Sequence, residues 1–193
     1  DVNLEKQYLT VRRSMRYNNA RHKIEIGATK RRKVRTVDFC DTLAEILRTA
    51  KLEQHKNRFK YGELYRLNYY CEVKEKDRNY YEVYTLPRNE KVPEGYKEIS
   101  FVCLRPDGAY ESPSTIGIMC KRASKKVKGL EGFHFHQLRH TFTSNLLSNG
   151  AAPKDVQELL GHSDVSTTMN VYAHSTREAK RTSARLLDKV VGG

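Results

Sequence analysis

The sequence predicts an α+β fold, a mainly helical domain with a three-stranded antiparallel sheet near its N-terminus and a β insertion. Residues 7–39 contain three runs rich in β-branched and aromatic residues, separated by turn-forming or basic connections. Tyrosine-rich runs within residues 65–100 predict the inserted strands, and residues 112–193 carry apolar residues at helical spacing. The three runs of residues 1–40 are therefore expected to form a β meander.

Helix boundaries follow from residues that favour helix ends. Asp41 is the predicted N-cap of a helix that runs to Tyr61, and Gly62 ends it. Within the predicted helix from His134, the i, i+4, i+8 residues Leu138, Phe142 and Leu146 are expected to face the core. The other predicted helices span 114–128, 153–160, 164–173 and 176–190.

The size and composition indicate one globular domain. The chain has 193 residues, of which 38% are hydrophobic, and no run is long and apolar enough to span a bilayer. We therefore expect a soluble intracellular protein. Its four cysteines form no CxxC pair, so we expect reduced and mostly buried thiols.

The net charge indicates a polyanionic partner. Thirty-six Lys and Arg residues oppose 23 Asp and Glu residues, which leaves +13 at pH 7 and a pI of about 9.6. Nucleic acid is the commonest ligand of such a protein, although a merely soluble basic protein has the same composition. Anionic membrane fits less well, because no basic helix has a strong apolar face.

A histidine and an arginine lie three residues apart in the segment HQLRH. One helix face can present His136 and Arg139 to the same phosphate, with Arg139 offering two parallel N–H donors. An ordinary surface pair fits the spacing equally well. A metal site made of His134, His136 and His140 is a third reading, but the segment lacks an acidic ligand and places an arginine between two histidines.

Further along, the segment ELLGHSDVSTTMNVYAH places His162 directly after a helix-ending glycine. His162 is therefore expected to project from an exposed turn, ten residues before Tyr172. The spacing of Val165, Met169 and Tyr172 is also that of a core-facing helix stripe, and on periodicity alone Tyr172 is a buried tyrosine.

These two segments together resemble the C-terminal motifs of the tyrosine recombinase (phage integrase) family, HxxRH followed by LGH and a tyrosine. The segments ATKRRKVRTVDF and HKNRFKYGELY are similar to integrases of conjugative transposons and related mobile elements. The likeness covers nearly the whole chain except about residues 65–100. It implies that residues 1–193 are the C-terminal part of a recombinase catalytic domain, with residues 112–193 as its helical part.

The resemblance implies a site-specific recombinase that cleaves and rejoins DNA through a 3′-phosphotyrosine, integrating or excising a mobile element. Tyr172 would be the nucleophile, Arg139 and His162 would stabilise the transition-state charge, and His136 would assist proton transfer. Lys30, in the hairpin after the second strand, would protonate the 5′-oxygen. His140 would have a supporting role, and neither a metal nor another cofactor is implied.

Double-stranded DNA is the implied partner, in the bacterial cytoplasm. For the cations of the predicted helix 114–128, a solvated basic face is an equal alternative. The closing helix, with Ala179, Leu186, Leu187 and Val190 on its apolar side, would join protomers on DNA or pack on its own domain. The residues expected to contact DNA are Arg31, Arg32, Lys33, Lys121, Arg122, Lys125, Ser166, Thr167 and Thr168.

The sequence departs from the family pattern in one respect. In the family, the first catalytic arginine lies shortly before a conserved segment, and DVNLEK at the start of this sequence resembles the end of that segment. Arg12, Arg13 and Arg16 lie in a predicted strand and do not match the position of that arginine. The arginine and the N-terminal DNA-binding domain are thus missing, so the isolated chain is expected to be inactive. A noncatalytic DNA-binding module and a type IB topoisomerase are the alternative functions.

Overall fold

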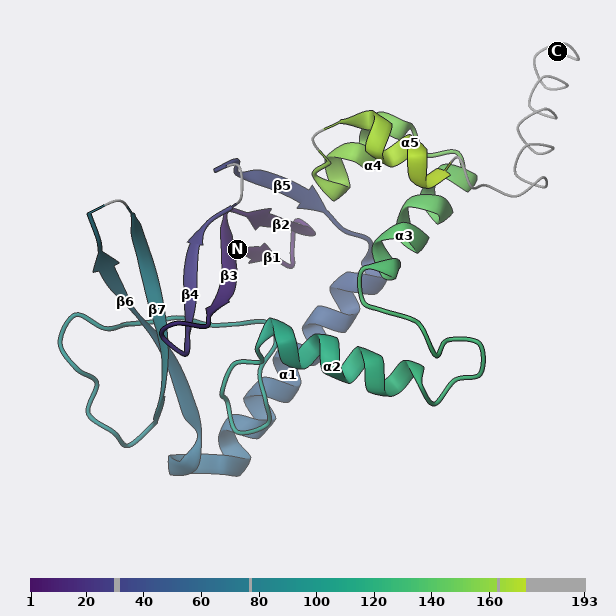
Figure 1. The fold of residues 1–193 in the computed structure, drawn as a ribbon. Helices are drawn as coiled ribbons and strands as arrows, with labels where there is room; N and C mark the ends of the chain where they lie inside the picture. Colours follow the sequence, from purple (N-terminus) through teal and green to yellow (C-terminus); the bar gives the residue numbers. More distant parts are fainter. Residues whose placement is uncertain (30–31, 77, 163, 173–193) are drawn as a thin grey trace, which may run out of the picture. The chain divides into compact units, whose positions relative to one another are not determined.

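The elements follow the predicted order along the chain, but the strands pair differently from the prediction (Figure 1). The computed structural model describes residues 1–29, 32–76, 78–162 and 164–172. Its strands are β1 (Val2–Asn3), β2 (Tyr8–Val11), β3 (Arg13–Asn18), β4 (Lys23–Ala28), β5 (Arg35–Asp38), β6 (Arg66–Lys74), β7 (Asn79–Pro87) and β8 (Lys97–Glu98). Its helices are α1 (Asp41–Tyr61), the 3-10 helix η1 (Gly62–Leu64), α2 (Pro113–Ser124), α3 (Gln137–Ser148), α4 (Pro153–Leu160) and α5 (Val165–Tyr172).

The chain forms two units, Asp1–Met119 and the part from Cys120 onward. The fold is α+β as predicted. A mainly helical character is not confirmed, because the first unit contains antiparallel sheets of three and five strands. The predicted helix 176–190 lies outside the described residues.

The three runs of residues 7–39 do not form a simple meander. The first run is divided at Arg12 into β2 and β3, and β5 pairs with β2 instead of β4. Strand β4 pairs with β3 on one edge and with β7 on the other, where Glu25 faces Glu82 and Ile26 faces Tyr81. Because β7 covers that edge, β5 completes a separate sheet in the order β1-β2-β5.

The strands predicted within residues 65–100 are confirmed as a long hairpin. Strands β6 and β7 pair over nine residues each, from Arg66 opposite Pro87 to Lys74 opposite Asn79. The short strand β8 adds to β6, which gives the five-stranded order β3-β4-β7-β6-β8. That this hairpin is an insertion relative to the family that the sequence resembles stays a prediction.

One face of the five-stranded sheet carries the core of the first unit. Successive residues of a strand point to opposite faces, so Ile24 and Ile26 of β4 lie on the same side as Val83 of β7. The partly buried side chains packed against them are Met15, Tyr81, Ile99, Phe101 and Tyr110. The segment that follows β8 thus covers this apolar face.

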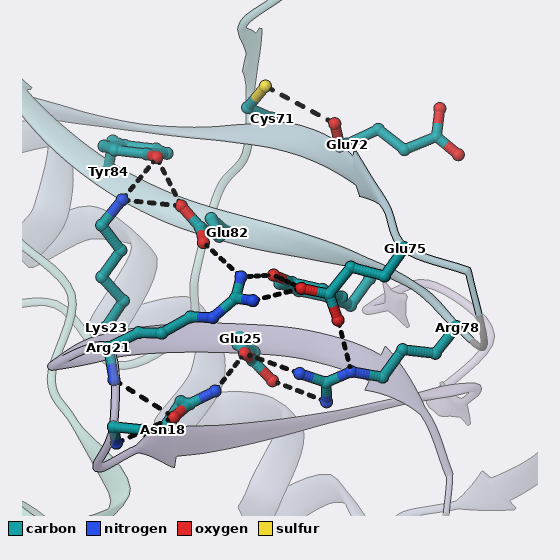
Figure 2. Close-up of polar contacts among 12 residues, drawn as sticks. Asn18, Arg21, Lys23, Glu25, Cys71, Glu72, Glu75, Arg78, Glu82 and Tyr84 are labelled. Carbon is teal, nitrogen blue, oxygen red and sulfur yellow. Dashed lines mark hydrogen bonds and ion pairs between the residues drawn. The ribbon is translucent and has the colours of Figure 1, made fainter.

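The opposite face is polar and densely ion-paired, and we call it the ionic face (Figure 2). The carboxylate of Glu25 is only 1% exposed. It accepts hydrogen bonds from Arg16 (Nη2–Oε2 2.9 Å), Asn18 (Nδ2–Oε1 2.6 Å) and Arg78 (Nη1–Oε2 3.3 Å). Burial alone would raise the pKa of Glu25, but the bonds from Asn18 and Arg16 outweigh it and lower the pKa.

A second carboxylate of the ionic face is held in the same way. Glu82 accepts from Lys23 Nζ at 2.7 Å and from the Tyr84 hydroxyl at 2.5 Å, and Arg21 contacts both Glu82 and Glu75. The bond from Lys23 lowers the pKa of Glu82, and burial raises the pKa of Tyr84 to about 12. The cations of β3 and β4 on this face are therefore used within the protein.

Helix α1 ends at Tyr61 as predicted and begins at Asp41, one residue earlier than predicted. Gly62 follows it with φ +53°, a conformation that favours glycine. Cys40 occupies the N-cap position instead of Asp41, which lies in the first turn and accepts a hydrogen bond from Gln7 Nε2 at 2.6 Å. Helix α2 ends at Ser124, four residues before the predicted end.

The second unit packs α3, α4 and α5 around Leu147, Val156 and Leu160. The predicted core stripe of α3 is wrong at two positions, because Leu138 is 48% and Phe142 44% exposed. The buried side of α3 is instead formed by Thr143 and Leu147. The cysteines are free thiols as expected, but Cys40 and Cys103 are exposed, and the other two are half-buried.

Candidate DNA-cleavage site

The basic residues predicted to contact DNA lie in two segments. One is the connection between β4 and β5, and the other is α2 with the residues just after it. Lys30 and Arg31 lie outside the described residues. Arg32 and Lys33 are exposed on the connection between β4 and β5, where Arg32 N donates to Thr29 O at 2.8 Å. Along α2 and just beyond it, Lys121, Arg122 and Lys125 are exposed.

The second unit brings Arg139 and His162 together. Arg139 lies in the first turn of α3, and His162 follows Gly161, whose left-handed conformation (φ +67°) ends α4. Arg139 Nε donates to His162 Nε2 at 3.0 Å, and Arg139 Nη2 donates to the Leu160 carbonyl oxygen at 2.7 Å. The two residues are 23 positions apart in the sequence, so this pairing confirms that the two motifs meet in space.

The prediction that His162 projects into solvent is wrong. Its ring is half-buried, and its Nδ1 lies 2.8 Å from Thr168 Oγ1. Because a guanidinium N–H can only donate, Nε2 must accept, and Nδ1 therefore carries the proton and donates to Thr168. Burial lowers the pKa of His162, and Arg139, His140 and His136 lower it further. The imidazole is thus held neutral in one tautomer.

Thr168 has a different place from the one predicted. It was expected to contact phosphate, but its side chain is fully buried and bonded to His162. Ser166 is exposed and bonds Asp164, and the side chain of Thr167 lies outside the described part. In the predicted stripe of Val165, Met169 and Tyr172, Met169 is exposed, whereas its neighbour Thr168 is buried.

Several supporting residues were missed by the sequence analysis. Gln157, which is buried, donates from Nε2 to the His162 carbonyl oxygen at 3.0 Å, and His162 N donates to the Gln157 carbonyl at 3.0 Å. Thr143 is buried and its hydroxyl donates to the Arg139 carbonyl at 2.8 Å. The four-residue spacing of Thr143 from Arg139 is the one signal that predicts such a bond.

His136, His140 and Tyr172 complete the predicted set. His136 occupies the N-cap of α3, and its ring lies 5.2 Å from that of His140, edge to face. A cavity of about 410 Å³ is lined by His136 and Arg139 together with Phe135, Leu138, Phe142, Leu159 and Leu160. Tyr172 is the last residue of α5, four residues after Thr168, and its side chain lies outside the described residues.

Two further observations concern the part of the chain that the structure describes. No three histidine, cysteine, aspartate or glutamate side chains there are grouped so as to hold a metal ion, His134, His136 and His140 included. None of the described helices combines the length and apolar character needed to cross a membrane.

The fold and the paired motifs define the class of protein, and comparison with known proteins agrees. The phage integrase family matches residues 5–179, which is most of the chain. The chain therefore belongs to the phage integrase family, the tyrosine recombinases.

Several curated relatives carry recombinase names. Tyrosine recombinase XerC of Bacillus licheniformis is 40% identical over 81 residues, which cover 42% of this chain and 26% of the relative. Tyrosine recombinase XerA of Pyrococcus horikoshii is 39% identical over 85 residues, with 42% and 29% covered. The chain thus spans roughly a quarter of these relatives' length.

Solved structures share the fold at low sequence identity. The Tn1549 transposon integrase in complex with transposon right end DNA has a TM-score of 0.62 and 22% identity, over 97% of this chain and 51% of that one. XerA recombinase has a TM-score of 0.54 and 20% identity, over 95% and 47%. The chain spans about half of each.

Proposed function

We propose that this chain carries the strand-cleaving residues of a site-specific recombinase that integrates or excises a mobile DNA element. The observation that supports this most directly is the contact of Arg139 with His162, since two motifs from separate helices converge on one position. A merely structural surface pair at HQLRH would not require the LGH histidine to meet it.

The proposed reaction begins with attack of the Tyr172 phenolic oxygen on a DNA phosphorus. An O–P bond forms to tyrosine, and the bond from phosphorus to the 5′-oxygen breaks, which leaves a 3′-phosphotyrosine and a 5′-hydroxyl. Arg139 would hold two non-bridging oxygens through its N–H donors, and His162 would stand beside it. The phenol proton would pass to His136 or to solvent, and the reversal of both steps rejoins the strand.

His162 would need a further proton for this role. Its Nδ1–H is bonded to Thr168 and its Nε2 accepts from Arg139, so Nε2 would have to take up a proton before it could donate to a phosphate oxygen. The negative charge of bound DNA favours that protonation. Thr168 and Gln157 hold the ring and backbone of His162 at the same time, so its position does not depend on DNA. Thr168 is thus a positioning residue. Lys30, on the connection after β4, would give its proton to the departing 5′-oxygen.

The test is covalent capture of DNA by the full-length protein. A nicked suicide substrate traps the phosphotyrosine adduct, which a denaturing gel separates from free DNA. Tyr172→Phe should abolish the adduct and leave DNA affinity nearly unchanged, because only the attacking oxygen is removed. Tyr17→Phe, at an exposed tyrosine of β3, is the matched control and should form adduct normally.

The same experiment separates the alternatives. Adduct that persists in Tyr172→Phe would refute the nucleophile assignment. Tight DNA binding without adduct in the unmodified protein would favour a noncatalytic DNA-binding module. Relaxation of supercoiled DNA without site preference would favour a type IB topoisomerase, which has the same chemistry.

A further inference from the structure

Both ring nitrogens of His162 have partners in this structure. Nδ1 lies 2.8 Å from Thr168 Oγ1, and Nε2 accepts from Arg139 Nε at 3.0 Å. Because a guanidinium only donates, Nε2 carries no proton, and the one proton of the neutral ring is on Nδ1. The edge of the ring beside Arg139 therefore offers an acceptor and no donor.

A DNA phosphate requires the opposite at this edge of the ring. Its non-bridging oxygens are anionic and only accept hydrogen bonds, so the lone pair of Nε2 would repel them. Two changes of His162 would turn Nε2 into a donor. Either the ring takes up a second proton at Nε2, or the ring stays neutral and its one proton is on Nε2 instead of Nδ1.

Uptake of a second proton changes fewer bonds than the neutral alternative. The imidazolium keeps its Nδ1–H bond to Thr168, which is fully buried, and gains Nε2–H as a donor to the phosphate. The Nε–H of Arg139 would then move its bond from Nε2 to a phosphate oxygen. A neutral ring would also need the buried bond to Thr168 to reverse its direction, and its bond to the phosphate would lack the strength of a charge-assisted one.

Three groups of α3 oppose this second proton before DNA binds. Burial has the largest effect and lowers the pKa of His162, and Arg139, His140 and His136 lower it further. The rings of His136 and His140 lie 5.2 Å apart, edge to face. A nearby anion would reverse this balance, because it favours the charged form of the imidazole.

Helices α4 and α5 supply no such anion to the ring in the part of the chain that the structure describes. Helix α4 contacts His162 through the neutral amide of Gln157, and α5 contacts it through the hydroxyl of Thr168. Tyr172, whose side chain lies outside the described residues, is a further titratable group of α5. The charged residues of α4 and of the turn before α5 are exposed and do not shift the pKa of His162: Lys154, Asp155, Glu158 and Asp164.

We propose that DNA and one proton bind the cleavage site together. A phosphate of the bound DNA would draw a proton from solvent onto Nε2 of His162, so that DNA is held more tightly as the pH falls. The proton and the phosphate each strengthen the binding of the other by the same factor. This inference rests on the proposed function, because it assigns the phosphate to the same site.

The pH window follows from the two states of His162. In the absence of DNA its pKa lies below the ordinary value of about 6.5, and the charge of a phosphate within hydrogen-bond distance raises the pKa in the complex. Between these two values the complex holds one proton more than its separate components. The affinity therefore rises as the pH falls through this window and levels off below it.

The experiment is a calorimetric titration of the full-length protein with the nicked duplex, in the Tyr172→Phe background so that cleavage adds no heat. Titration at pH 7 in two buffers of different ionisation enthalpy gives the number of protons taken up per complex. His162→Gln in the same background should take up fewer protons, by at least about half a proton. Between pH 6.5 and 7.5 the parent should lose about threefold to tenfold more affinity than His162→Gln, because one linked proton is a factor of ten per pH unit.

Variants at two other positions locate the proton. His55→Gln, at an exposed histidine of α1, should keep the full uptake. Thr168→Val should reduce the uptake, because the Nδ1–H of the imidazolium loses its acceptor, and Thr168→Ser should restore it. A role of Thr168 in stability alone would leave the proton count unchanged.

Nuclear magnetic resonance of the protein with ¹⁵N-labelled histidine observes the ring directly. Nε2 of His162 should be unprotonated without DNA, and both ring nitrogens should carry protons in the DNA complex. A neutral ring in the complex, or an equal proton count in His162→Gln and its parent, would overturn the proposal.

The outcomes separate this proposal from the cleavage function. Adduct formation by the protein with Tyr172 intact, together with no proton uptake at His162, would refute the proton linkage and leave the recombinase assignment in place. Uptake that depends on His162 without any adduct would refute strand cleavage and support a proton-linked phosphate site.

Discussion

The ionic face of the five-stranded sheet and the Arg139–His162 pair place charged side chains beside different kinds of partner. On the ionic face, Glu25 and Glu82 are buried carboxylates surrounded by cations that belong to the protein. At the candidate cleavage site, Arg139 instead donates to a neutral imidazole and to a carbonyl oxygen. On the ionic face buried carboxylates accept from cations, whereas at the candidate cleavage site an imidazole nitrogen and a carbonyl oxygen accept from Arg139.

This difference explains why the many cations of the chain are not equivalent. Arg16 contributes to the positive charge and is engaged with Glu25. Arg21, Lys23 and Arg78 contribute as well, and each is also engaged with a carboxylate (Figure 2). Their removal should therefore affect the sheet, while the removal of Arg139 should affect chemistry.

The largest expected effect is on cleavage. Arg139→Ala should lower the rate of adduct formation about 100- to 1000-fold, because a donor to the transition-state charge is lost. Arg78→Ala, the matched change on the ionic face, should leave the rate within about twofold. Single-turnover kinetics on the suicide substrate measure both. Similar losses in the two variants would show that the two regions are not distinct in function.

The second prediction concerns the stability of the fold, where a substitution on the ionic face is expected to have a large effect. Glu25→Ala should lower the free energy of unfolding by about 2 kcal/mol, less than a fully buried ion pair costs, because Arg16 and Arg78 are 59% and 38% exposed in their side chains and can be resolvated. Urea denaturation measures the change.

The control for this prediction is Glu53→Ala, at an exposed carboxylate paired with Lys56, which should cost less than about 0.5 kcal/mol. Equal effects of the two substitutions would show that the ionic face does not stabilise the sheet.

The smallest expected effect is a dependence of stability on pH from His162. Because its pKa is lowered in the folded state, the unfolded chain binds more protons as the pH falls below about 6.5, so stability is present above that pH and is lost below it. Unfolding free energies at pH 7.5 and 5.5 should show this loss, and His162→Gln should reduce it.

The matched control for the pH measurement is His55→Gln on α1, which should keep the full pH dependence. The range above pH 5 also separates His162 from Glu25, whose lowered pKa makes its contribution fall away only as the pH drops below about 4.3. An unchanged pH dependence in His162→Gln would contradict the assignment.

Sequence reasoning succeeded where a local signal was strong. Gly62 and Gly161 ended helices where predicted, because a left-handed or otherwise positive φ at these positions favours glycine. It failed at Leu138 and Phe142, where helical periodicity selected the wrong face of α3. The buried positions of that helix depend on which side meets α4 and α5, and α3 alone does not contain that information.

The paired motifs by themselves determined the family, because HQLRH and LGH followed by a tyrosine rarely occur together in order by chance. Tertiary structure decided which residues hold the histidine and which strands pair. Arg139 reaches His162 only after α3 and α4 pack, and β5 joins β2 only because β7 takes the edge of β4. Contacts between segments far apart in the chain depend on the packing of several elements at once, whereas a motif or a helix end depends on its neighbours in sequence.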